Sequence, residues 1–86
     1  MPEISRFYGI VIQMYYGDHA PPHFHVSYNG LTAKFKIETL SWLDEQIPLR
    51  ARALVEEWAK LHQKELLQAF RMAASLKVPQ KIDPLP

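Results

Sequence analysis

The sequence contains no cysteine among its 86 residues. This absence excludes a disulfide scaffold, a thiol nucleophile, an iron–sulfur cluster and a cysteine-based zinc finger. The chain also has almost no excess charge, because ten Lys and Arg residues nearly balance nine Asp and Glu residues, for a formal charge of +1. No overall electrostatic field therefore favours a nucleic acid or an anionic membrane as a partner.

Long hydrophobic segments are missing as well. No apolar run reaches the roughly 18 residues that suggest a membrane-spanning helix, and the first residues lack the basic and apolar regions of a secretory signal. We therefore expect a cytoplasmic protein with no membrane association. The phosphate-binding loop, the dinucleotide-binding GxGxxG, the GxSxG elbow and HExxH are also absent, which argues against the enzyme classes that depend on them.

The first half of the chain is typical of β-structure within one small domain over residues 1–86. Residues 7–16 are rich in β-branched and aromatic side chains and predict one central strand. Alternating apolar and polar residues predict strands over 23–29 and 31–38, joined at Asn29-Gly30, a pair that favours a two-residue hairpin turn. A short fourth strand is expected over 39–43, and the prolines within 17–22 predict a loop.

After Pro48 the apolar residues recur at helical spacing, which predicts a helix over residues 48–76. A continuous helix of this length would measure about 42 Å, whereas a compact domain of this size has a radius of gyration of about 12 Å. The helix therefore either bends or breaks, or it projects and packs against a partner. Three prolines in residues 77–86 favour an extended tail.

The predicted fold class is α+β, with a three- or four-stranded antiparallel sheet and a long C-terminal helix packed on one face. The sheet is built from the N-terminal strand and the hairpin. Leu67 and Phe70 lie off the main apolar stripe of the helix, so we expect them to be exposed. Their exposure would favour a homodimer in which the helix ends pair.

Three histidines fall within seven residues, in the segment His19-Ala-Pro-Pro-His23-Phe-His25. On an extended strand His23 and His25 share one face about 7 Å apart, and the rigid Pro-Pro bridge holds His19 near them. Such imidazoles can ligate a divalent transition metal such as zinc, with Asp18 or Glu65 as a further ligand. They can equally supply an acid and a base for phosphodiester chemistry, or they pack as a structural or binding surface.

The predicted helix carries two polar residues, His62 and Glu65, inside its apolar stripe. Glu65 lies close to the centre line of the stripe, where a buried carboxylate needs a hydrogen-bonded or cationic partner. Either Glu65 pairs with Arg6 or a histidine and fixes how helix and sheet dock, or His62 and Glu65 complete a site that begins on the sheet.

Basic residues stand where the predicted helix begins, since Arg50 and Arg52 follow Pro48 closely. Cations at a helix N-terminus oppose the helix dipole. These two side chains therefore either form a phosphate cradle with the free backbone amides or make ion pairs. The acidic candidates for such ion pairs are Asp44, Glu45 and Glu56.

A second basic feature is the pair Lys34 and Lys36, which points outward from the predicted hairpin. Together with Tyr28 and Tyr8 these lysines could hold an RNA backbone and one or two stacked bases. The alternative is that they are ordinary edge charges that keep the sheet soluble.

Four segments of the chain closely resemble domain-of-unknown-function family 4160: Ile-Ser-Arg-Phe-Tyr-Gly-Ile at 4–10, Asp-His-Ala-Pro-Pro-His-Phe-His-Val at 18–26, Ile-Glu-Thr-Leu at 37–40, and Glu-Trp-Ala at 57–59 with His62, Glu65 and Leu66. The resemblance extends over nearly the whole chain. It implies a small, uncharacterised prokaryotic protein of a kind often encoded beside a member of domain-of-unknown-function family 2442, and therefore one half of a toxin–antitoxin-like pair. It implies no catalytic residues.

Protein–protein binding within such a pair, with RNA as the target of a toxin, is therefore the first functional expectation. In that case His23 and His25 would transfer protons, Arg6, Arg50 or Arg52 would hold phosphate, and Glu65 would orient His62 or a sheet histidine. The alternative is a metal-binding protein or metal-dependent hydrolase that uses His19, His23 and His25. A third hypothesis is a structural subunit whose histidines only pack.

Overall fold

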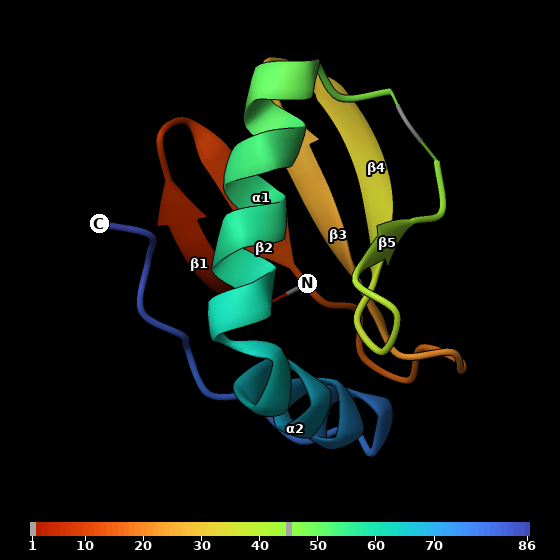
Figure 1. Cartoon of the computed structure of the whole chain (residues 1–86). Coiled ribbons are helices and arrows are strands. Elements are labelled where there is room, and N and C mark those ends of the chain that lie inside the picture. The colour runs from red at the N-terminus through yellow and green to blue at the C-terminus, as the bar shows by residue number, and fades with distance from the viewer. Residues whose placement is uncertain (1, 45) are drawn as a thin grey trace.

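The computed structural model describes residues 2–44 and 46–86. In this part of the chain five strands precede two helices (Figure 1). The elements are β1 (Glu3–Phe7), β2 (Ile10–Gln13), β3 (His23–Tyr28), β4 (Leu31–Lys36), β5 (Ser41–Trp42), α1 (Leu49–Leu61) and α2 (Gln63–Ala74). The strands form one antiparallel sheet in the order β1-β2-β3-β4-β5, so each strand pairs with the next one along the chain. The predicted α+β class is confirmed.

The prediction of one strand over residues 7–16 is wrong. β1 ends at Phe7 and β2 begins at Ile10, and these two residues face each other across a tight hairpin. Tyr8 and Gly9 form the turn with positive φ angles of 51° and 78°. This backbone matches the two-residue turn that suits the twist of paired strands, and glycine adopts it without steric cost. Residues before Phe7 thus form a strand that the apolar run alone did not indicate.

The predicted hairpin around Asn29-Gly30 is present. Its register pairs Tyr28 with Leu31 and continues to His23 opposite Lys36. Both turn residues have positive φ angles, 48° and 79°, as this turn type requires. The expected fourth strand over 39–43 corresponds to β5, which is only two residues long and pairs with the end of β4.

The helix predicted over 48–76 is broken into α1 and α2 at His62, where the backbone leaves helical angles (φ −118°, ψ 23°). Pro48 was expected in the first turn of the helix, and it lies one residue earlier, at the N-cap position before Leu49. The side-chain Nε2 of Gln63 donates hydrogen bonds to the carbonyls of Ile37 (2.9 Å) and Glu38 (3.2 Å), which hold the start of α2 against the sheet. These contacts are tertiary, so the local sequence gives no sign of the break.

α1 crosses one face of the sheet, and α2 lies at the end of the sheet where β3 begins (Figure 1). The face under α1 is apolar, and fully buried Trp58 lies against it, with its ring centre 5.2 Å from that of Phe7 and 5.8 Å from that of Phe24. The predicted basis for a homodimer is wrong, because Phe70 is buried and Leu67 packs against the core. The break at His62 changes which face α2 turns inward.

The C-terminal tail is extended, as predicted, and it packs back onto the domain. The backbone N–H of Ile82 donates to the carbonyl of Ile4 on β1 (3.0 Å). Ile82 and Leu85 are buried, and the indole N–H of Trp58 donates to the carbonyl of Asp83 (2.8 Å). The tail therefore covers the outer edge of β1. Neither helix has the length and apolar character needed to cross a membrane, within the residues described.

The sheet face opposite α1, called the open face below, is polar along its centre. The strand register places Gln13 beside His25 and His25 beside Lys34 in one row across β2, β3 and β4. The next row contains Ser27 and Thr32. Alternation along each strand separates these residues from the core.

Candidate metal centre

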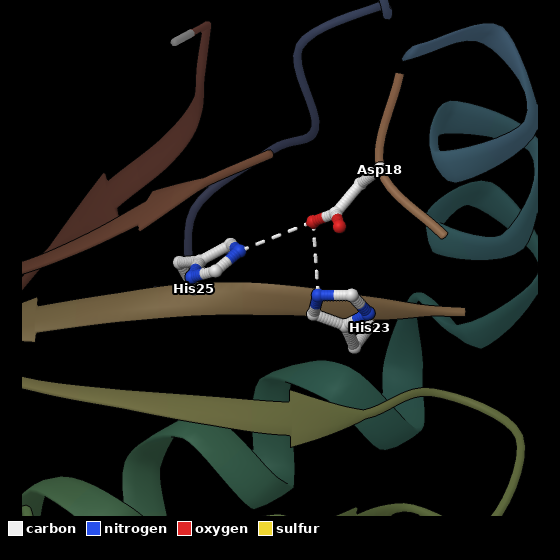
Figure 2. Close-up of side chains that lie close together, drawn as sticks. All are labelled: Asp18, His23 and His25. Atoms are coloured by element: carbon white, nitrogen blue, oxygen red, sulfur yellow. Dashed lines mark hydrogen bonds and ion pairs between the residues drawn. The ribbon is translucent and has the colours of Figure 1, made fainter. Parts of the chain in front are cut away.

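The candidate site forms where the loop of residues 17–22 meets the start of β3. His23 and His25 are alternate residues of β3 and therefore project from the same face of the strand. The loop turns back so that Asp18 lies over both rings (Figure 2). The backbone N–H of Gly17 donates to the carbonyl of Ala73 (2.9 Å), which fixes the base of the loop to the end of α2.

Both histidine rings of the cluster contact the same carboxylate oxygen. Oδ2 of Asp18 lies 2.9 Å from Nε2 of His23 and 3.3 Å from Nε2 of His25. Figure 2 shows both rings directing these nitrogens at the same oxygen. One ligand-type atom from each of the three residues lies within 4.8 Å of the others. Two imidazole nitrogens and one carboxylate oxygen thus converge on a volume the size of one ion.

The ring of His23 is held in a defined tautomer. Its Nδ1 lies 2.8 Å from the carbonyl oxygen of Pro21. Because a carbonyl oxygen can only accept a hydrogen bond, Nδ1 carries the proton. In the neutral ring Nε2 then presents a lone pair to the carboxylate of Asp18, and two lone pairs at that distance repel unless a proton or a cation lies between them.

The surroundings favour an ionised Asp18 and a neutral His25. Burial lowers the pKa of His25 below its ordinary 6.5, and the charges of His23 and Lys34 add to this, against the opposing hydrogen bond with Asp18. Burial raises the pKa of Asp18, but hydrogen bonds from His25 and from the backbone N–H of His19, with the charge of His23, bring that pKa below its ordinary 3.8.

Aromatic side chains support both imidazoles. The ring of Phe70 on α2 lies 5.7 Å from that of His23. Tyr15, which follows β2, stacks on His25 with a ring-centre distance of 4.0 Å and an interplanar angle of 12°. These contacts limit the rotation of the two rings and so keep their nitrogens aimed at Asp18.

The structure brings part of the histidine segment together, and the membership of the cluster differs from the prediction. His23 and His25 converge, and Asp18, expected as a further ligand, is the third member. His19 is exposed, and its imidazole lies outside the cluster. The chain passes through the bend at Ala20-Pro21 between them, so the Pro-Pro bridge brings Asp18 rather than His19 over β3.

His62 and Glu65 do not complete this site. They pair with each other, with Nδ1 of His62 2.7 Å from Oε1 of Glu65, at the junction of α1 and α2. The side chain of Glu65 is 57% exposed, so its predicted place in the buried stripe is wrong. The break at His62 shifts the helical phase, and Glu65 therefore turns toward solvent. Of its predicted partners, a histidine is the one it meets, because Arg6 pairs with Glu3 (2.7 Å).

The predicted phosphate-binding arginines are not gathered at the cluster. Arg50 lines a separate hollow with Tyr8 and Tyr28. Tyr28 ends β3, about 17 Å along the strand from His23. Arg52 lies on the first turn of α1, and its backbone N–H donates to the carbonyl of Pro48 (3.0 Å).

Two of the acidic partners expected for these arginines make other contacts. Glu56 accepts a hydrogen bond from the indole of Trp42 (2.7 Å), and Asp44 accepts one from the backbone N–H of Lys34 (3.3 Å). Glu45 lies outside the described residues.

Lys34 and Lys36 do share the open face with the histidines. Lys36 is the register partner of His23, and Lys34 is that of His25. The aromatic residue beside them is Tyr15, however, and not Tyr28 or Tyr8, which line the other hollow. Sequence reasoning missed Tyr15, although the alternation from Gln13 through a buried Met14 indicates that it points outward.

The fold and the cluster define a small α+β protein with an Asp-His-His group at the end of a meander sheet. The domain of unknown function DUF4160 matches residues 9–71, which is well over half of the chain. The chain therefore belongs to the DUF4160 family. No curated protein and no solved structure matches it. The family is described only as a domain of unknown function, so membership carries no activity with it.

Proposed function

We propose that this protein binds one divalent transition metal ion, zinc in the first instance, through Asp18, His23 and His25, and uses it for hydrolytic chemistry. The observation that carries the proposal is the hydrogen bond from Nδ1 of His23 to the carbonyl of Pro21. Metal-binding histidines almost always donate their second ring nitrogen to a carbonyl or carboxylate in this way. With Nδ1 as the donor, the neutral form of the ring would offer the lone pair of Nε2 to an ion in the cluster.

The ligand set favours a catalytic type of metal site. Two imidazoles and one carboxylate are three protein ligands, and a zinc ion with three protein ligands keeps a position for water or substrate. The same set also suits iron(II), which takes two histidines and a carboxylate on one side of the ion. An ion in such a site lowers the pKa of its bound water to about 7, which makes hydroxide available at neutral pH.

Proton transfer by the two histidines is the weaker alternative. Both ring nitrogens of His23 are already engaged, one with Pro21 and the other with Asp18. A general acid or base needs a nitrogen within hydrogen-bond reach of its substrate. His25 also directs its Nε2 at Asp18. The contacts that orient these ring nitrogens toward a metal position therefore leave them unavailable for proton transfer to a substrate.

The test is the metal content and zinc affinity of untagged protein. We expect about one zinc per chain, and a fall in melting temperature when a chelator removes it. Asp18→Asn, which changes charge without changing size, should remove stoichiometric binding, as should His23→Gln. His19→Ala is the matched control, because it removes an exposed histidine of the same loop and should leave zinc binding intact.

A metal content below about 0.1 per chain, with no thermal shift on adding zinc, would contradict the proposal. Equal zinc binding by wild type and Asp18→Asn, with loss in His19→Ala, would place the ion elsewhere. The toxin–antitoxin-like pairing with a family 2442 protein stays a separate prediction, which metal binding neither requires nor excludes.

A further inference from the structure

A polar hollow of about 290 Å³ lies on the open face and shares His25 with the cluster of Asp18, His23 and His25. Its walls come from β2, β3, β4 and the segments after β2 and β5, and they include Gln13, Tyr15, His25, Ser27, Lys34 and Asp44. His25 belongs to both features, since it lines the hollow and directs Nε2 at Asp18. A ligand in the hollow would therefore contact the cluster through the ring of His25.

The lining indicates the chemistry of the ligand. Most of the lining side chains are hydrogen-bonding groups, Lys34 adds an exposed cation, and Asp44 adds one carboxylate. Hydroxyl, amide and ammonium donors match the oxygens of phosphate and sugar and offer little to an apolar molecule. The volume is at the lower limit of about 300 Å³ for small-molecule pockets, which suits one small polar unit.

The hollow is also lined by one aromatic ring, that of Tyr15. Tyr15 is 42% exposed, and its ring is held in place by the stack on His25. Since one side of the ring is occupied by the imidazole, the other can receive a flat ligand without further ordering of the side chain. A base stacked on a fixed aromatic, next to a lysine that meets the phosphate, is the usual arrangement for single-stranded nucleic acid.

We propose that the open face is the substrate side of the site and binds one nucleotide of single-stranded RNA, with the base on Tyr15 and the phosphate between Lys34 and the cluster. The proposal rests on the metal site proposed above for the position of the phosphate. Charge complementarity supports it, because Lys34 and Lys36, in the same rows of the sheet as His25 and His23, together with a bound divalent ion would outweigh the carboxylates of Asp44 and Asp18.

Fluorescence anisotropy with a labelled eight-nucleotide RNA tests the proposal on zinc-loaded protein. Tyr15→Ala should weaken binding by about 5- to 100-fold, the loss expected for one stacked base, and Tyr15→Phe should retain it. Lys34→Gln should lower the slope of log K against log salt by about 0.7, the value for one phosphate contact on a single strand.

Two controls match these variants. Tyr16→Ala removes a similarly exposed tyrosine that does not line the hollow, and Lys64→Gln removes an exposed lysine of α2. Both should bind RNA as the wild type does. The zinc content of each variant is measured in parallel, so that a change at the cluster is distinguished from a change on the open face.

If zinc-loaded wild type does not bind RNA, the inference is overturned and the metal proposal stands. The same holds if Tyr15→Ala and Tyr16→Ala weaken RNA binding equally. If the chain binds no zinc, the proposed function fails. If the metal-free protein then still binds RNA and Tyr15→Ala weakens that binding, the open face is supported as the RNA-binding surface. The same result would contradict the proposed position of the phosphate at the ion.

Discussion

The attachment of the C-terminal tail to the core gives a quantitative prediction. Trp58 is fully buried, and its indole N–H donates to the carbonyl of Asp83 at 2.8 Å. Trp58→Phe keeps the aromatic contacts with Phe7 and Phe24 but removes that donor. The lost hydrogen bond costs about 1 kcal/mol, and a cavity of a few tens of Å³, at about 24 cal/mol per Å³, costs about as much again.

The expected decrease in the free energy of unfolding is therefore about 2 kcal/mol. For a chain of this size that corresponds to a fall in melting temperature of about 8–16 °C. Urea denaturation followed by far-ultraviolet circular dichroism measures it without relying on the fluorescence of the residue removed.

A double-mutant cycle isolates the bond itself. A chain that ends at Ile82 lacks Asp83, so this truncation and Trp58→Phe remove the same interaction and should not be additive, with a coupling of about 1 kcal/mol. A loss below about 0.5 kcal/mol for Trp58→Phe, or a coupling of zero, would refute the inference that the tail is fixed through this contact.

Further predictions concern the cluster, the helix break and the partner. Because folding lowers the pKa of His25, the unfolded chain binds more protons just below pH 6.5, so the metal-free protein should lose stability as pH falls through that range, and His25→Gln should lose less. Gln63→Ala should cost about 1–2 kcal/mol in a urea titration, because two carbonyls lose their donor, whereas exposed Gln68→Ala should change stability by less than about 0.5 kcal/mol. If the chain is the toxin of the predicted pair, its expression alone should arrest growth, and co-expression of a family 2442 protein should relieve that arrest; failure of the two proteins to co-purify would contradict the pairing.

The local β-structure was largely predictable from the sequence. The Asn29-Gly30 turn and the alternation on either side specify where the hairpin turns and which faces its strands present, because turn chemistry and side-chain period act within a few residues, although β4 ends at Lys36 instead of residue 38. The same reasoning failed at Tyr8-Gly9. There an apolar run on both sides of the turn concealed the hairpin, since a buried central strand and two short strands that face the core have the same composition.

Tertiary contacts explain the remaining errors. The helix breaks at His62 although the sequence there has good helix-forming residues, because Gln63 bonds to carbonyls that belong to the β4–β5 connection. That break turned Glu65 outward and Phe70 inward, so two predictions made from a continuous helical stripe were wrong together.

The candidate site was half predictable. The spacing of His23 and His25 determines that they share a face of a strand. The choice between His19 and Asp18 depends on the path of a six-residue loop, which the residue types did not determine. Tyr15 could have been found from strand alternation alone, whereas the contact between Phe70 and His23 depends on the direction of α2.

X-ray absorption spectroscopy of zinc-loaded protein tests the central claim most directly, since it reports the atoms bound to the ion. We predict one zinc per chain with two imidazole nitrogens at about 2.0–2.1 Å and a carboxylate oxygen at about 2.0–2.2 Å. His25→Gln should bind zinc below one per chain, and the zinc that it still binds should show one imidazole instead of two. A zinc shell with no imidazole, or one that His25→Gln leaves unchanged, would contradict the account.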